Sequence, residues 1–509
     1  MIKNKIDKPV SDSYKITESG FNVEIKITGG LGELKIYQIS RQDIPPATNA
    51  LLDKIKQDLI KTVRISAEEI LDPKIINELK KRFQASAEEL LVQKLPKLDL
   101  RMRQLLITTL VKEMLGLGDL EILLNDPNLE EIVVLSANEP VRVFHKKFGW
   151  LNTNLYLPNE QVIKNYFNTI ARRVGRQITT LNPLLDAHLV TGDRANAVLY
   201  PISSKGNTLT IRKFSRDPWT VTDFIANDTC NAHIFALMWL VMQYEGNILI
   251  SGGTGSGKTS LLNVMMPFIP PNHRIISIED TRELMLPDYL YWTPLTVRQP
   301  NPEGKGEVTM LDLLVNSLRM RPDRIILGEM RKADQAEVLF EAMHTGHSVY
   351  ATVHADSLIT TIQRLINPPI NVPSNLLAAV NLNVVMFRNR KENKRSVYQV
   401  GEFIPTEEDG RVTVKPILLY RLDPTTSKII LHQKPIRLFE DLSRYTGLSQ
   451  SQINDEIAKK EKILNWMVEN NIRGINKVGR VMHLYYLDPV DLYSKIEKKL
   501  KPSQISKEL

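Results

Sequence analysis

The ten residues 251–260, SGGTGSGKTS, constrain the fold of this chain more than any other stretch. The apolar run NILIS leads into them and predicts a buried strand, while KTSLLNVMM at their end predicts a helix. Gly252, Gly257, Lys258 and Thr259 match the pattern G-x-x-x-x-G-K-[ST]. Glycines let the backbone curl until successive N–H groups face one anion, and the helix start adds partial positive charge. The stretch therefore predicts a phosphate-binding loop between a strand and a helix.

Residue types in this loop suggest what it holds. Lys258 would reach the β- and γ-phosphates of ATP, and the Thr259 hydroxyl would ligate Mg²⁺. The alternative is an ordinary glycine-rich turn, against which the flanking strand and helix argue. ATP and Mg²⁺ are therefore the expected cofactors. The residues expected around the phosphates are Gly252, Gly253, Thr254, Gly255, Ser256, Gly257, Lys258, Thr259 and Ser260.

Length and composition bound the class of protein. A chain of 509 residues is too long for one ordinary core, so two to four domains are expected. No apolar run approaches the roughly 18 residues that span a bilayer, and the start MIKNKIDKPV has no apolar signal core, so we expect a cytoplasmic protein. The net charge of +8, spread over the whole length, is weak evidence for a membrane surface or for nucleic acid. The single cysteine, Cys230, excludes an intramolecular disulfide and is expected to be a small buried or half-buried residue.

The first part of the chain divides into two segments. Residues 1–45 carry alternating stretches, FNVEIKI and ELKIYQI, which predict a hairpin or a loosely attached arm. Residues 46–118 are helical in pattern and heavily charged. Within them SAEE occurs at 66–69 and at 86–89, with the spacing of a capping box at a helix start.

The rest of the chain divides into three segments. Residues 119–214 mix strand and helix patterns and predict an α/β domain. Residues 215–225, with a proline among polar residues, predict a flexible linker. In residues 226–509 short apolar strands alternate with helices, which favours a mostly parallel sheet, followed by C-terminal helices. Within this segment the apolar window 235–244 predicts a buried helix.

Two apolar strands after the loop end in acids. RIISIEDTRE ends its apolar part at Glu279, and DRIILGEMR ends at Glu329. Carboxylates at strand ends beside a phosphate loop can orient water or hold Mg²⁺. A solvated surface acid is the alternative for each. Further on, His347 and His354 flank an apolar stretch, and with no third ligand in view a hydrogen bond to phosphate or to the acids is favoured over a metal site.

Four of these stretches together resemble a known family. GGTGSGKTS, ISIEDTRE, LRMRPDRIILGEMR and GHSVYATVHAD are similar to the Walker A, Asp box, Walker B and His box of secretion ATPases, the hexameric motors of type II and type IV secretion, type IV pili and the archaellum. A weaker resemblance extends to TGDRANAVLYPISSKGNTLTIRKF. The resemblance implies a RecA-like P-loop NTPase C-terminal domain, preceded by a mixed α/β N-terminal domain with a helical extension, and a homohexamer.

The resemblance also implies roles for single residues. Glu279 would position the attacking water, with Glu283 as a second candidate, and Glu329 would serve Mg²⁺ together with Thr259. His347 and His354 would sense the γ-phosphate or couple it to movement.

Arginines are a further requirement, because a guanidinium can stabilise the charge of the phosphoryl-transfer transition state. Arg194 and Arg212 match family positions that reach the nucleotide from the N-terminal domain, although a surface salt bridge is the alternative for both. The other candidates are Arg319, Arg321, Arg324 and Arg331.

Within the family the sequence favours the archaeal branch. One cysteine leaves no room for the tetracysteine zinc insert of many bacterial members, and retraction-type pilus ATPases lack so long an N-terminal extension. The expected function is an ATP-driven motor that assembles or rotates an archaellum by moving a membrane platform protein. Its expected partners are that protein and other cytoplasmic motor components at the inner face of the membrane. An archaeal pilus-assembly or secretion ATPase is the alternative.

Two other function classes fit less well. A nucleic-acid translocase needs basic and aromatic residues lining a pore, and aromatics are 6% of this chain with no interleaved basic run, so no nucleic-acid partner is expected. A nucleotide-binding protein without turnover is opposed by Lys258, Thr259 and the two strand-end acids.

Overall fold

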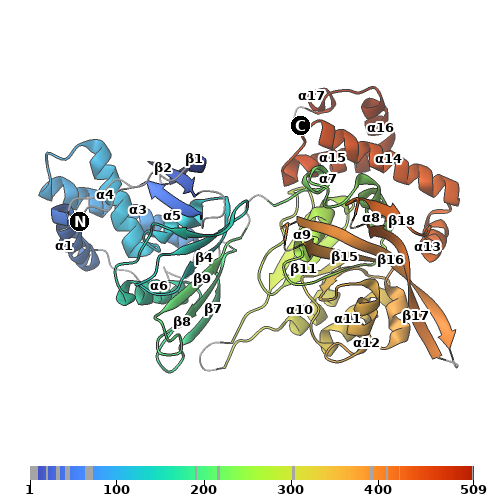
Figure 1. Ribbon diagram of the computed structural model, residues 1–509, viewed down its shortest axis with the longest axis horizontal. Coiled ribbons are helices and arrows are strands. Elements are labelled where there is room, and N and C mark those ends of the chain that lie inside the picture. The colour runs from blue at the N-terminus through green and yellow to red at the C-terminus, as the bar shows by residue number, and fades with distance from the viewer. Residues whose placement is uncertain are drawn as a thin grey trace. The chain divides into compact units, whose positions relative to one another are not determined.

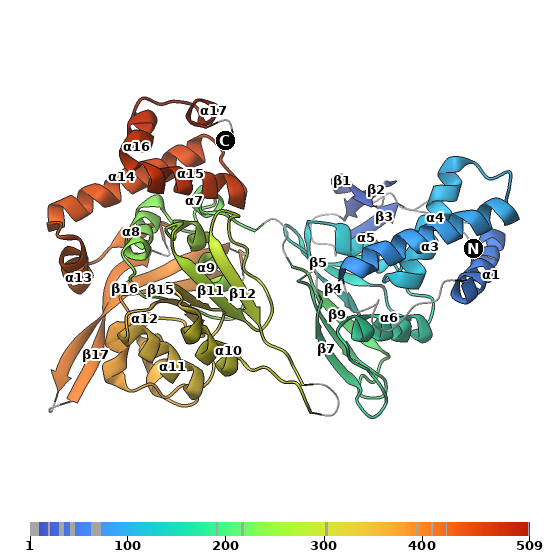
Figure 2. The ribbon, with the colours of Figure 1, turned by 180° about the vertical axis from the view of Figure 1, so that it is seen from behind.

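The computed structural model divides into two compact units, each with its own sheet and core (Figures 1 and 2). One comprises Met1–Arg216 with Asn301–Lys305, and the other comprises Asp217–Pro300 with Gly306–Leu509. The residues that the structure describes are 10–18, 21–29, 35–40, 46–62, 73–189, 192–214, 218–300, 304–389, 391–392, 394–408, 411–423, 425–506 and 508–509.

The described residues of the first unit form a nine-stranded sheet in the order β1-β2-β3-β6-β5-β4-β9-β8-β7. Its strands are β1 (Val10–Glu18), β2 (Phe21–Thr28), β3 (Ile36–Ser40), β4 (Leu129–Val134), β5 (Arg142–His145), β6 (Gly149–Thr153), β7 (Leu184–His188), β8 (Arg194–Val198) and β9 (Thr208–Arg212). All neighbours are antiparallel except β3 and β6, which run parallel.

The N-terminal strands are built into this sheet. β2 and β3 form the expected hairpin, but β3 also pairs with β6, and the hydroxyls of Tyr14 and Tyr37 each donate to Asp126 at 2.6 Å. The prediction of a loosely attached arm is therefore wrong for the described part of residues 1–45. Burial of Tyr37 against the rest of the unit explains the attachment.

The helices of the first unit are α1 (Pro46–Thr62), α3 (Pro73–Lys94), α4 (Leu100–Leu115), α5 (Leu120–Asn125) and α6 (Glu160–Arg173). Helices α1, α3 and α4 share a core of their own. The SAEE at 86–89 lies inside α3, so the predicted helix start there is wrong. Leu79, Phe83, Ala87 and Leu91 continue one buried stripe through it, and this packing overrides the capping signal. The SAEE at 66–69 lies outside the described residues.

The described residues of the second unit form another nine-stranded sheet, in the order β12-β11-β13-β14-β10-β15-β16-β17-β18. Its strands are β10 (Ile248–Gly252), β11 (Arg274–Glu279), β12 (Tyr291–Thr296), β13 (Arg324–Leu327), β14 (Ser348–Val353), β15 (Leu382–Asn389), β16 (Lys394–Glu408), β17 (Arg411–Leu422) and β18 (Ile429–Leu431). The six neighbouring strands β12, β11, β13, β14, β10 and β15 are parallel, which confirms the predicted α/β class with a RecA-like arrangement. The strands β16, β17 and β18 add an antiparallel extension at one side of the sheet.

Helices cover both faces of this sheet (Figures 1 and 2). They are α7 (Val221–Ala226), α8 (Ala232–Gln243), α9 (Lys258–Met265), α10 (Met310–Ser317), α11 (Ala333–His344), α12 (Leu358–Ile366), α13 (Arg437–Thr446), α14 (Gln450–Glu469), α15 (Ile475–Leu487), α16 (Pro489–Glu497) and α17 (Pro502–Ile505), with short 3₁₀ turns at Met266–Phe268, Leu318–Met320 and Ser374–Ala379. Among the described helices, none has both the length and the apolar character that a bilayer crossing requires.

Two expectations about the start of this unit have different outcomes. The window 235–244 lies in α8 except for its last residue, and α8 is buried almost throughout, as predicted. The predicted linker 215–225 extends too far, because α7 occupies its second half and buries Val221 and Phe224 in the core of the second unit. Residues 215–217 lie outside the described residues. Cys230 is buried, as expected.

Candidate nucleotide site

The phosphate loop and the two strand-end acids of the second unit meet because its central strands are parallel. β10 runs beside β14, with Ser251 opposite Val353, and β11 runs beside β13, with Ile278 opposite Leu327. The segments that follow these strands therefore leave the sheet at one edge, which is where open α/β sheets bind ligands. The phosphate loop, Glu279, Glu329 and His354 all lie at this carboxyl edge.

The loop joins β10 to α9 as the sequence predicts. Gly257 has φ 96° immediately before Lys258, the first residue of α9. Lys258 is largely buried, and its Nζ donates to the carbonyls of Gly252 and Gly253, both at 3.0 Å. Burial lowers the pKa of Lys258, while the nearby carboxylates of Glu329 and Asp356 oppose that change. Thr259 follows as the second residue of the helix.

Gly252 is the loop position least tolerant of a side chain. Its φ is 155°, and a Cβ there would lie 2.5 Å from Ser256 Oγ and 2.6 Å from the carbonyl oxygen of Met386. We expect Gly252→Ala to lower the free energy of unfolding by about 1–3 kcal/mol, measured by urea denaturation. Gly253→Ala is the matched control, because its Cβ would meet only the movable carboxylate end of Asp356. Equal stability of the two variants would contradict the prediction.

Glu279 ends β11 and is only 2% exposed. Its Oε1 accepts the backbone N–H groups of Glu283 and Leu284, at 2.9 and 3.0 Å. Its Oε2 is buried without a hydrogen-bond partner among the described residues. Burial raises the pKa of Glu279 to about 7, although the two backbone hydrogen bonds oppose that change. The side chain is therefore fixed by one oxygen and has the other available to bind a proton or a water molecule.

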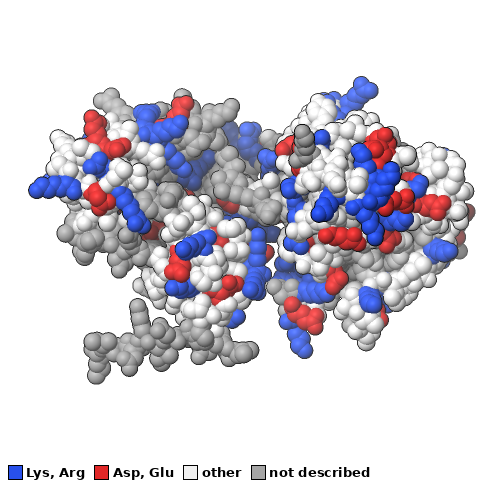
Figure 3. Space-filling model, turned by 90° about the horizontal axis from the view of Figure 1, so that it is seen from above, with Lys and Arg blue, Asp and Glu red and all other residues white. Residues whose placement is uncertain are grey.

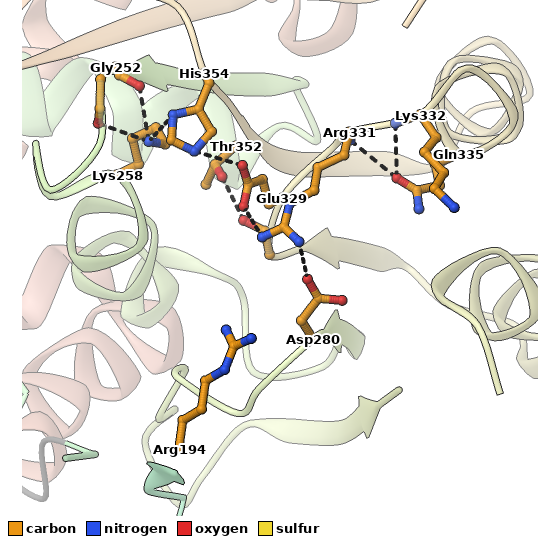
Figure 4. A network of polar contacts seen from close by, with 12 residues as sticks. Arg194, Gly252, Lys258, Asp280, Glu329, Arg331, Lys332, Gln335, Thr352 and His354 are labelled. Atoms are coloured by element: carbon orange, nitrogen blue, oxygen red, sulfur yellow. Dashed lines mark hydrogen bonds and ion pairs between the residues drawn. The ribbon is translucent and has the colours of Figure 1, made fainter. Parts of the chain in front are cut away.

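Glu329 is the centre of a polar network that begins at the loop lysine (Figure 4). Its Oε1 lies 2.7 Å from His354 Nε2, and its Oε2 pairs with Arg331 at 2.5 Å. Arg331 also pairs with Asp280 at 2.6 Å. His354 Nδ1 lies 3.3 Å from Lys258 Nζ. The network therefore runs from Lys258 through His354, Glu329 and Arg331 to Asp280.

The network fixes the state of His354. An ammonium group can only donate, so Nδ1 accepts from Lys258 and Nε2 carries the proton that is donated to Glu329. Burial and the charge of Lys258 lower the pKa of His354, which favours this neutral form. His354 thus connects the residue expected at the phosphates to the acid expected at Mg²⁺, within one chain.

Some predicted residues do not join this site. His347 precedes β14, at the opposite edge of the sheet, where its Nδ1 lies 3.2 Å from Thr345 Oγ1. A γ-phosphate on its own chain's loop is therefore out of its reach. Arg319, Arg321 and Arg324 are also at that edge, since they precede or begin β13, and Arg324 is fully buried and donates to the Met242 carbonyl. Of the four alternative arginines, only Arg331 lies at the carboxyl edge.

Arg194 and Arg212 belong to the first unit. They lie directly opposite each other on β8 and β9, and Arg212 also lies opposite Glu131 on β4. Arg194 makes two hydrogen bonds to the Asp186 carboxylate, at 3.0 and 2.6 Å. Both arginines are exposed. Because they are cross-strand neighbours, they lie side by side on one face of the sheet.

Sequence reasoning missed several residues at the carboxyl edge. Asp280 directly follows Glu279, and Asp356 lies two residues after His354. Their closeness in sequence to these candidates was the signal that could have identified them. Arg388, near the end of β15, and Arg395, near the start of β16, lie against Gly255. Their only sequence signal is the basic run RNRKENKR, which cannot be assigned to the loop without knowing that β15 pairs with β10.

Comparison with known proteins identifies the family. The model described as "Type II/IV secretion system protein" matches residues 161–407. An uncharacterized protein of Methanocaldococcus jannaschii is 36% identical over 385 residues, which cover 74% of this chain and 69% of that protein. The type IV secretion system protein PtlH of Bordetella pertussis is 32% identical over 260 residues, 46% of this chain and 76% of that protein. The chain therefore belongs to the type II/IV secretion system protein family, and the resemblance of its four motifs is confirmed at that level.

The chain is also similar in sequence to a protein of solved structure. The crystal structure of the VirB11 ATPase from the Brucella suis type IV secretion system in complex with sulphate is 26% identical and covers 55% of this chain and 92% of that one, with a TM-score of 0.28.

Proposed function

We propose that this chain hydrolyses ATP and converts the reaction into domain movement. The observation that carries the proposal is the meeting of three groups at one sheet edge. These are Lys258 in a phosphate loop, the hydrogen-bonded pair His354 and Glu329, and the buried carboxylate of Glu279. A hydrolase of this class needs a phosphate grip, an acid near the metal and a carboxylate that orients water.

In the proposed mechanism, the N–H groups of residues 252–260 and the Lys258 ammonium bind the phosphates. Glu279 orients the attacking water through its unpartnered Oε2 and takes up its proton, which its raised pKa favours. Glu283 is the weaker candidate for that task, because the contact it makes to Glu279 comes from its backbone N–H. His354 joins Lys258 to Glu329 and so transmits a change at the γ-phosphate to the acid.

The residues present suit Mg²⁺. The Thr259 hydroxyl and the Glu329 carboxylate are the oxygen donors that this ion prefers. The described residues contain no group of three or more His, Cys, Asp or Glu side chains arranged to hold a metal ion. A P-loop site requires none, because phosphate oxygens and water complete the metal's coordination. When bound, the ion would neutralise part of the negative charge on the phosphate oxygens.

The larger assembly is part of the same proposal. We infer a homohexamer that works at the inner face of the cell membrane, moves a polytopic platform protein and assembles or rotates an archaellum. The archaeal relative that is 36% identical supports the archaeal branch, whereas PtlH keeps a secretion ATPase as the alternative. Arg194 and Arg212 would complete the phosphate site, from the same or a neighbouring subunit.

A nucleic-acid translocase remains the weaker candidate. Figure 3 shows basic and acidic side chains intermixed on the face formed by the C-terminal helices of the second unit. Among these helices, α14 and α16 carry the ion pairs Lys459–Glu456, Lys462–Glu497 and Lys495–Asp491. Mixed charge of this kind does not form the single-sign surface that a phosphate backbone attracts.

The test is ATP turnover by the full chain, measured alone, with anionic lipid vesicles and with double-stranded DNA. We expect Mg²⁺-dependent turnover that rises with vesicles and is unchanged by DNA, together with a hexamer by light scattering when ATP is present. Absence of turnover would overturn the enzyme proposal. Stimulation by DNA alone would favour the translocase, and a monomer with ATP at high protein concentration would exclude the ring.

A further inference from the structure

We propose that Arg388 and Arg395 form a second wall of the nucleotide site, on the side of the phosphate loop away from His354. In this proposal Arg388 contacts the phosphates of the bound nucleotide, and Arg395 is a positioning residue that holds the loop. The inference rests on the proposed function and adds two residues from its own chain to the site.

The two arginines reach the loop because of sheet order. β10 lies between β14 and β15, so β15 borders the loop on the side opposite the strand that leads to His354. Gly252, the last residue of β10, pairs with Met386 of β15. Two residues further along β15 is Arg388, which places it level with the loop itself.

Both side chains contact the same glycine. Arg395 Nε donates to the Gly255 carbonyl at 3.0 Å, across 140 residues of sequence. A Cβ built on Gly255 would lie 3.1 Å from Nη1 of Arg388, so that guanidinium is also against the loop. Arg395 Cδ would be 3.4 Å from a Cβ on Gly257. The arginines therefore line the loop from Gly255 to Gly257, next to the start of α9.

The charge arrangement favours an anion between them. Arg388 and Arg395 are direct cross-strand partners on the antiparallel pair β15–β16. Side chains directly opposite each other on an antiparallel pair have Cβ atoms only about 4.5–5.5 Å apart, so both guanidinium groups lie on one face of the hairpin. The segment 388–395 contains five basic residues and one acid. An anion with several charged oxygens, held by the neighbouring loop, would accept hydrogen bonds from these planar guanidinium groups.

The same contacts explain a separate role for Arg395. The loop binds phosphate through backbone N–H groups, whose directions depend on how each peptide is turned. By holding the Gly255 carbonyl, Arg395 fixes the peptide that joins Gly255 to Ser256. A lysine at this position would keep the charge but would lose the Nε–H that makes the contact.

The experiment measures ADP affinity by calorimetry in the full chain with Mg²⁺. We expect Arg388→Ala and Arg395→Ala each to weaken ADP binding about ten- to a hundredfold. The first removes charge-assisted hydrogen bonds to the phosphates, and the second removes the hydrogen bond that holds the Gly255 peptide of the loop. Arg388→Lys should recover part of the affinity, whereas Arg395→Lys should not. The salt dependence of ADP binding should also fall in the alanine variants. Arg421→Ala is the matched control, because that cation lies on β17, the next strand of the same sheet, and bonds to the Tyr398 hydroxyl instead.

The outcomes separate the two proposals. If the unchanged chain binds and hydrolyses ATP but both alanine variants keep the ADP affinity within about twofold of it, this inference is overturned and the proposed function stands. A lower melting temperature without ligand, combined with unchanged ADP affinity, would also overturn it, because it would show a purely structural role. If the unchanged chain itself binds no nucleotide, the proposed function fails first.

Discussion

Replacement of Lys258 by alanine is expected to lower ATP turnover by about 10²–10³-fold or more, because it removes a preorganised cation from the phosphates of the transition state. The side chain is largely buried and donates to two loop carbonyls, so no other described lysine has the same position at the loop. Nucleotide binding should weaken as well, and the rise in melting temperature that ADP gives to the unchanged chain should shrink with it.

Two controls accompany the Lys258→Ala measurement. The melting temperature without nucleotide should show that Lys258→Ala still folds. Lys495→Ala is the control, because that lysine pairs with Asp491 on the surface of α16 and should keep full turnover. Normal turnover by Lys258→Ala in a correctly folded protein would contradict the assignment of the loop.

Glu279→Gln is expected to have the second large effect. The amide keeps the size of the side chain but cannot take a proton from water, so turnover should fall by about 10²–10⁴-fold. ATP should still bind, because the phosphate loop is unchanged. Single-turnover assays and nucleotide binding would separate the two steps. Glu337→Gln, at an exposed position on α11, is the control for loss of one acid. A larger loss in Glu283→Gln than in Glu279→Gln would transfer the role to Glu283.

The raised pKa of Glu279 gives this prediction a pH dependence. Ionised Glu279 is the active form, so kcat/KM should rise with pH through about 7. Stability should change in the opposite direction. Burial favours the protonated form, so this group's contribution to folding is complete below its ordinary pKa and is lost as the pH rises through about 7. Glu279→Gln should flatten the pH dependence of stability over that range, as measured by urea denaturation without nucleotide.

The loop and the acids could be predicted because local sequence carries their geometry. Gly252 to Thr259 need only a strand before them and a helix after them, and both are visible as apolar patterns. Glu279 and Glu329 follow apolar strands, and parallel strands bring their ends together without further information. The class of the second sheet follows from the same alternation of strands and helices.

Other features depend on contacts between distant residues. His347 and His354 look equivalent in sequence, but β14 separates them by its whole length, so only His354 reaches the loop. The SAEE at 86–89 has a cap's spacing, yet tertiary packing continues α3 through it. Arg395 meets Gly255 across 140 residues, and no local pattern signals that meeting. Sequence periodicity predicts elements, and strand order decides which element ends become neighbours.

The network from Lys258 to Asp280 has a consequence for how any ligand enters. It contains two cations, two carboxylates and a neutral imidazole, so its charges already balance. An arriving phosphate or metal ion therefore does not bind to side chains of this network that lack a partner. It substitutes for partners that Lys258 and Glu329 have within the chain, and it releases Arg331 or His354 in doing so. Ligand binding at this site is therefore an exchange of partners. The side chains that it releases, Arg331 or His354, are the first groups whose contacts differ between the free and the ligand-bound protein.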